Sequence, residues 1–101
     1  MAMAGADVRV VLHAVLRQLV ADAQWQAEEA GDGSRERDFY AGVVKAAEDR
    51  LYSSGMAARQ DEAWLSSEPP GFREGYVKAS TMIMTVAANP PLRLVVPTPD
   101  H

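Results

Sequence analysis

Residues 34–53 read SRERDFYAGVVKAAEDRLYS and carry the clearest structural signal in the chain. Apolar residues recur there every three or four positions with charged residues between them, which predicts an amphipathic helix. Ser34 is a suitable N-cap, and Gly55 is placed to end the helix. An apolar face of this kind is stable only when another element covers it, so the stretch predicts a helical bundle. The predicted core face comprises Phe39, Tyr40, Val43, Val44, Ala47 and Leu51.

A longer helix is predicted before this one, over residues 7–30, with Asp7 as N-cap and Gly31-Asp32-Gly33 as its end. Its core face comprises Val8, Leu12, Val15, Leu16, Leu19 and Ala23. A second apolar strip lies roughly opposite and comprises Val10, Ala14, Ala21 and Trp25. A helix with two apolar strips is usually covered on both sides. The short glycine-rich loop between the two helices predicts a hairpin.

The rest of the chain predicts a third long helix, a short helix and a tail. The long helix is expected over residues 72–88, between Pro69-Pro70-Gly71 and Pro90-Pro91. Val77 and Met84 form a minor apolar strip on it, and residues 61–65 favour a short helix. The tail is bounded by prolines and expected to be extended, with Leu92, Leu94 and Val96 on one side.

The predicted fold class is therefore all-α, an antiparallel bundle of three long helices plus one short helix, with an extended C-terminal tail. One bundle domain is expected over residues 7–89. A flexible N-terminus over residues 1–6 precedes it, and the tail over residues 90–101 follows it.

Composition narrows the function classes. The chain has 101 residues, a net charge of −4 and no cysteine. The missing cysteines exclude disulfides and thiolate chemistry, and together with the absence of a signal peptide or membrane span they favour a cytoplasmic location. The acidic balance is unfavourable for binding nucleic acid, so a nucleic-acid partner is not expected. No membrane partner is expected either, because the sequence has no apolar stretch long enough to span a bilayer. Eight arginines against two lysines favour a GC-rich source genome, as in some bacteria and their phages.

Candidate catalytic groups are sparse. Glu28, Glu29, Asp32 and Glu48 could form a magnesium-carboxylate site of an all-α nucleotide hydrolase, since hard cations need several converging carboxylates. The spacing departs from the Glu-Glu-x-x-Glu pattern of such pyrophosphohydrolases, and a solvated helix end is the favoured interpretation. His13 and His101 make no metal-ligand pair. A nucleic-acid-linked regulator is a further alternative, with a helix-turn-helix near Trp64. We therefore predict no catalytic residue, no cofactor and no metal.

The favoured hypothesis is a non-enzymatic helical protein that acts by protein–protein contact, most simply as a homodimer, in a regulatory or inhibitory role. Three alternatives remain for the extra apolar residues: coverage by the chain itself, by a second copy, or by a partner's sheet to which the tail adds a strand. The predicted interface residues are Val10, Trp25, Val77, Met84, Leu92, Leu94 and Val96.

Overall fold

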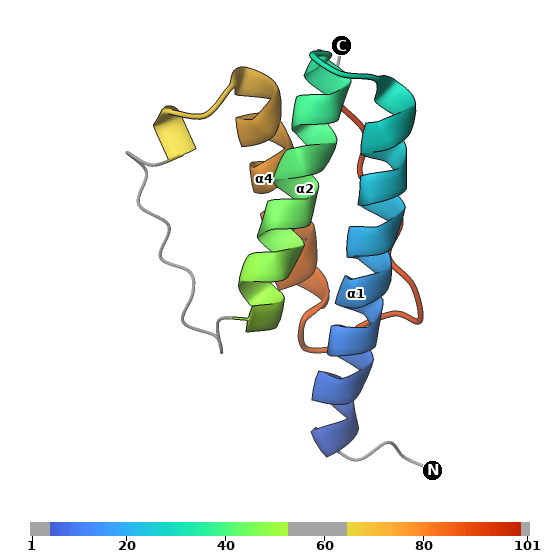
Figure 1. Cartoon of the computed structure of the whole chain (residues 1–101). Coiled ribbons are helices and arrows are strands. Elements are labelled where there is room, and N and C mark those ends of the chain that lie inside the picture. Colours follow the sequence, from blue (N-terminus) through green and yellow to red (C-terminus); the bar gives the residue numbers. More distant parts are fainter. Residues whose placement is uncertain (1–4, 53–64, 100–101) are drawn as a thin grey trace.

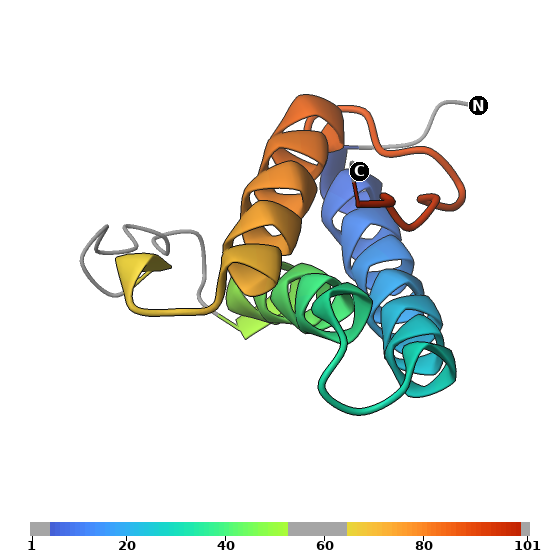
Figure 2. The ribbon, with the colours of Figure 1, turned by 90° about the horizontal axis from the view of Figure 1, so that it is seen from above.

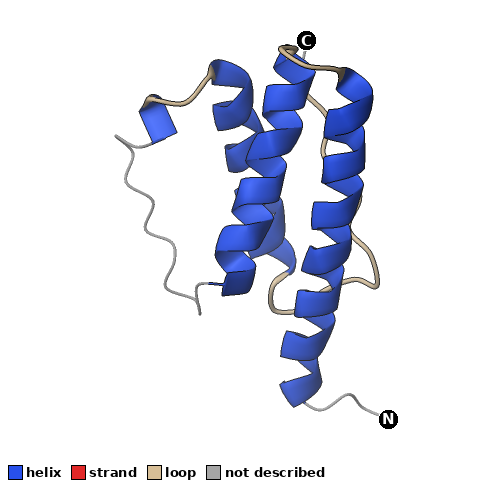
Figure 3. Cartoon of the chain, in the orientation of Figure 1, coloured by secondary structure: helices blue, strands red, loops and turns tan. Residues whose placement is uncertain are grey.

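The structure is a computed structural model that describes residues 5–52 and 65–99. Three helices account for most of these residues: α1 (Gly5–Ala30), α2 (Arg35–Tyr52) and α4 (Pro70–Val86). The described residues contain no strand (Figure 3), which confirms the predicted all-α class. The predicted short helix over residues 61–65 lies almost wholly outside the described residues. Helix α1 begins two residues earlier than expected, within the segment that was predicted to be a flexible N-terminus.

The turn between α1 and α2 forms where the sequence predicts it. Gly31 and Gly33 have φ angles of +87° and +76°, a left-handed geometry that glycine adopts without steric strain. The Ser34 hydroxyl accepts a hydrogen bond from the Arg37 amide at 3.0 Å and donates one to the Gly31 carbonyl at 3.0 Å. Ser34 is therefore the N-cap of α2, as predicted, and satisfies one of the four open amides of its first turn.

Helix α4 starts at the Pro69-Pro70-Gly71 sequence that was expected to precede it. Pro70 occupies the first turn of the helix, where its missing N–H removes no intrahelical hydrogen bond. The helix ends at Val86, two residues before the predicted end. The two prolines therefore belong to the start of the helix, and they are not part of a loop that precedes it.

Helices α2 and α4 approach each other closely at glycines. A Cβ atom added to Gly75 would lie 2.0 Å from the Phe39 carbonyl oxygen, and one added to Gly42 would lie 2.2 Å from the Phe72 carbonyl oxygen. These distances are far below any van der Waals contact. The two backbones therefore pack together without side chains between them, which Gly alone permits at these positions.

The direction of α4 differs from the expected antiparallel order. Gly71 packs against Arg35 and Gly75 against Phe39, so α2 and α4 begin side by side at one end. Figure 1 shows both helices descending from that end, while α1 ascends beside α2. The antiparallel order expected for all three helices is therefore not confirmed. Residues 53–69 lie between the two helices and are numerous enough to return the chain along α2, which is about 27 Å long.

The core lies where the predicted apolar faces meet. Five of the six predicted core residues of α1 are buried, and Val8 is half-buried. In α2, Val44 and Leu51 are half-buried and pack against the core. The tail also contributes, because Leu94 is buried with the helices. The buried apolar side chains are Leu12, Val15, Leu16, Leu19, Ala23, Phe39, Tyr40, Val43, Ala46, Ala47, Tyr76, Ala79, Ile83 and Leu94.

Candidate interaction surface

The second apolar strip of α1 remains exposed in the folded chain. Val10 is 68% exposed and Trp25 is 59% exposed, and Ala14 and Ala21 between them are exposed as well. Val10 and Trp25 are fifteen positions apart, which corresponds to about 22 Å along the helix axis. At 3.6 residues per turn, the positions of these residues place them on the side of α1 opposite the core face. The solvent side of α1 is therefore partly apolar over most of its length.

The minor strip of α4 is exposed too. Val77 and Met84 project away from the buried face of the helix, which contains Gly75, Tyr76, Ala79 and Ile83. Met84 is 70% exposed, and Tyr52 at the end of α2 is a further large apolar side chain in solvent. Tyr52 was not among the predicted interface residues, because its position at the predicted end of a helix gave no indication of its exposure.

Two predicted interface residues belong to the core of their own chain. Leu94 is 5% exposed, and Val96 packs against the core. The tail folds back onto the helices, so these side chains are covered within the chain. Leu92 was expected on the same side but is almost fully exposed, since the chain bends at this residue and the alternation of sides is interrupted.

The tail, residues 90–99, is held by side chains from two helices. The Arg93 guanidinium lies 2.9 Å from the Asp22 carboxylate on α1, and the Lys78 ammonium on α4 donates to the Thr98 carbonyl at 2.9 Å. Figure 2, which looks along the bundle, shows the tail on the side of α1 and α4 that faces away from α2. The tail therefore covers the side of the bundle that the three helices leave open.

An open pocket of about 480 Å³ lies between the tail and α1. Trp25 and Val95 both line it, so the exposed strip of α1 continues onto the outer side of the tail. Asp22, Gln26 and Arg93 contribute polar groups to the same wall. Sequence reasoning missed Asp22 and Gln26, because only the fold-back of the tail brings them next to Arg93 and Val95.

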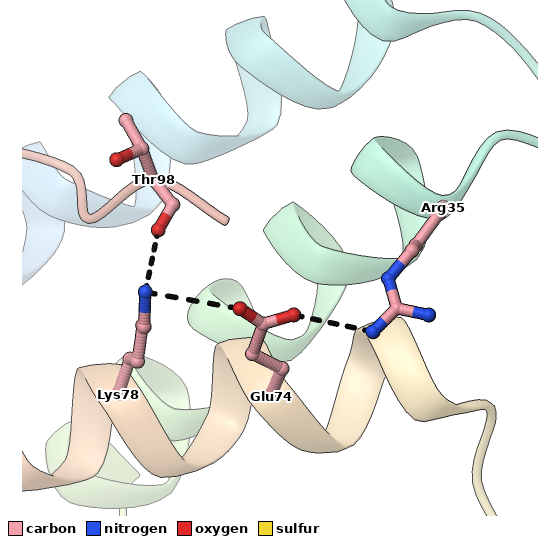
Figure 4. Close-up of polar contacts among 4 residues, drawn as sticks. All are labelled: Arg35, Glu74, Lys78 and Thr98. Atoms are coloured by element: carbon pink, nitrogen blue, oxygen red, sulfur yellow. Dashed lines mark hydrogen bonds and ion pairs between the residues drawn. The ribbon is translucent and has the colours of Figure 1, made fainter. Parts of the chain in front are cut away.

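A chain of charged groups links the tail to the beginnings of α2 and α4 (Figure 4). The Glu74 carboxylate lies 3.4 Å from the Arg35 guanidinium and 3.7 Å from the Lys78 ammonium, which in turn reaches Thr98. The Lys78 ammonium also lies 5.8 Å from the centre of the Phe39 ring. Lys78 thus contacts α2, α4 and the tail, and its charge is compensated within the chain.

A buried tyrosine makes the main polar contact in the interior. The Tyr76 hydroxyl donates to the Asp49 carboxylate at 2.7 Å, and Asp49 also pairs with Lys45 at 3.1 Å. Burial, and then the hydrogen bond and negative charge of Asp49, raise the pKa of the Tyr76 phenol well above its usual range. Tyr76 is therefore a neutral structural donor at physiological pH. It is not poised for proton transfer.

The carboxylates considered for magnesium do not converge. Within residues 5–52 and 65–99, which include Glu28, Glu29, Asp32 and Glu48, no three carboxylate or imidazole groups lie close enough to hold a metal ion. Asp32 instead pairs with Arg37 across the turn. His13 is exposed on α1. His101 and Trp64 lie outside the described residues.

Comparisons with protein families, curated proteins and solved structures gave no match. In the described part of the chain, none of the helices has both the length and the apolar content needed to cross a membrane. The exposed apolar residues of α1, α4 and the tail form the candidate interaction surface.

Proposed function

We propose that this protein is a non-enzymatic helical homodimer that acts by protein–protein contact. One observation carries the proposal: the apolar strip of α1 from Val10 to Trp25 stays exposed after the tail has folded back, and it meets the exposed Val95 at the pocket. Contiguous apolar surface on a small protein marks an interaction site, and twofold association is the commonest way to cover one.

The other exposed apolar side chains support the same proposal. Val77 and Met84 lie on the outer side of α4, and Leu92 is almost fully exposed on the tail. A second copy that covers these residues together with the α1 strip would remove a large apolar area from water, the main favourable term in protein association. The proposal also includes a short helix within residues 61–65, a cytoplasmic location, and a regulatory or inhibitory role.

Light scattering coupled to size-exclusion chromatography tests the dimer. We expect a mass of twice the 11.0 kDa of the chain at micromolar concentration. Trp25→Glu should shift the protein to the monomer, because it places a charge in the apolar strip. Gln24→Glu is the matched control, since it adds the same charge at the neighbouring exposed position outside the strip.

A strictly monomeric wild type at high concentration would overturn the proposal. Equal dissociation by both variants would show that added negative charge, and not the loss of the tryptophan, separates the subunits. Circular dichroism of each variant establishes that its helical content is unchanged.

A further inference from the structure

The tail is attached to the bundle by side-chain packing, one ion pair and one hydrogen bond from a lysine side chain to its main chain. Leu94 is inserted into the core, Arg93 pairs with Asp22, and Thr98 accepts from Lys78. Within residues 5–52 and 65–99, the main-chain N–H and C=O groups of residues 92–97 make no hydrogen bond. Helices and sheets are held by continuous main-chain ladders, which this segment lacks. We call the surface of α1 and α4 that the tail covers, which includes Asp22 and Lys78, its seat. The tail can therefore leave this seat without disrupting secondary structure.

The segment between α4 and Arg93, which includes the first residues of the tail, is short and contains two prolines. A turn over residues 87–89 and a bend at Leu92 direct the tail back along the bundle, and the turn is closed by a hydrogen bond from the Asn89 amide to the Val86 carbonyl at 3.0 Å. Pro90 and Pro91 disfavour helical geometry in the residue before each of them. If the turn and the bend straighten, the prolines favour an extended connection that points away from the bundle.

The connection lies at the end of the bundle where other helix ends also lie (Figure 1). Helix α1 begins there and α2 and α4 end there, and the first turns of α1 extend beyond the other helices (Figure 1). Val10, Tyr52, Met84 and Leu92 belong to these segments, and each is more than two-thirds exposed. A tail that leaves its own bundle at this end would bring a second bundle directly against these four residues.

We propose that two copies of this chain exchange their tails, so that the tail of each copy occupies the seat on α1 and α4 of the other. This inference rests on the proposed homodimer and specifies how its subunits associate. Arg93 of one copy would pair with Asp22 of the other, and Leu94 would fill the partner's core. Exchange retains each contact between tail and bundle that is seen in the single chain, so each bundle loses little stability. It also covers the exposed end of both bundles, which makes association more favourable.

The absence of cysteine from the sequence allows a direct test. A chain with both Asp22→Cys and Arg93→Cys has one thiol on α1 and one on the tail, at the two residues of the ion pair. A short bis-maleimide then links each tail to the α1 helix on which it lies, whether that helix belongs to the same chain or to the other copy. Exchanged tails give a covalent dimer of twice the chain mass on a denaturing gel. Tails seated on their own bundle give an intramolecular link and a band at the mass of the single chain.

The control combines Gln24→Cys with Arg93→Cys, which moves one thiol to another face of α1, and it should give little covalent dimer. The outcomes separate the two proposals. If light scattering shows a dimer but the cross-link is intramolecular, tail exchange is wrong and the homodimer stands. If the protein is a monomer and the cross-link is intramolecular, both proposals fail. A covalent dimer that forms equally in the control indicates random collision and also contradicts exchange.

Discussion

The guanidinium of Arg93 lies 2.9 Å from the carboxylate of Asp22, which joins the tail to α1 across 71 positions of sequence. Both side chains are partly exposed, so solvent screens this ion pair and its contribution to stability is small. The adjacent Leu94 is buried and contributes far more. Leu94 therefore supplies most of the free energy that holds the tail against the bundle.

Leu94→Ala should lower the free energy of unfolding by about 2–4 kcal/mol, because it removes buried methyl groups and leaves a cavity under the tail. Leu92→Ala is the matched control, since the same change is made two residues earlier at a side chain that is 95% exposed. Urea unfolding followed by circular dichroism measures both. Equal effects at the two positions would contradict the burial of Leu94.

Gly75→Ala should destabilise the protein strongly. Alanine is more favourable than glycine in the interior of a helix by about 1 kcal/mol. However, the added Cβ would lie 2.0 Å from the Phe39 carbonyl oxygen. Two helix backbones must then separate, which outweighs the gain in helix propensity, and we expect a net loss of about 3 kcal/mol.

Thermal melting measures this effect, with Gly33→Ala as the comparison. Gly33 has open space around it but a φ angle of +76°, so alanine there should lose only about 1 kcal/mol from left-handed strain. A Gly75→Ala protein that melts at or above the wild-type temperature would show that α2 and α4 do not pack this closely.

Tyr76 should make stability fall at alkaline pH. Its pKa in the folded state lies above the value in the unfolded chain, about 10, so the stabilisation is complete below pH 10 and is lost as the pH rises further. At pH 11 the loss from this group is on the order of 1 kcal/mol. Urea unfolding at pH 8 and pH 11 measures it, and Tyr76→Phe should lose correspondingly less over the same interval. An identical fall in both proteins would assign the alkaline effect to other groups.

Ser34→Ala should lower the free energy of unfolding by about 1 kcal/mol, because the Arg37 amide loses its 3.0 Å hydrogen bond to the Ser34 hydroxyl. Ser34→Asp should retain most of the stability, since aspartate also caps helices and its charge is favourable at a helix N-terminus. Urea denaturation of the two variants distinguishes the loss of the cap from any other effect of changing this residue.

Sequence periodicity predicts the helices of this protein because their apolar residues recur at the helical period. The core faces of α1 and α2, the Ser34 cap and the turn glycines all follow from local spacing and local backbone geometry. The position of the second apolar strip, which contains Val10 and Trp25, follows in the same way, but its exposure is known only from the structure. Each of these features follows from the residues of a single helix or a single turn.

Tertiary structure decides the rest, because the deciding contacts join residues that are far apart in the sequence. Both the direction of α4 and the role of its glycines depend on backbone contact with α2, at Arg35 for Gly71 and at Phe39 for Gly75. The periodicity of one helix contains no information on such a contact. Leu92 and Leu94 are the same residue type two positions apart, yet one is exposed and the other is buried. A bend in the chain and the seat formed by α1 and α4 separate them, and neither can be inferred from alternation along the tail.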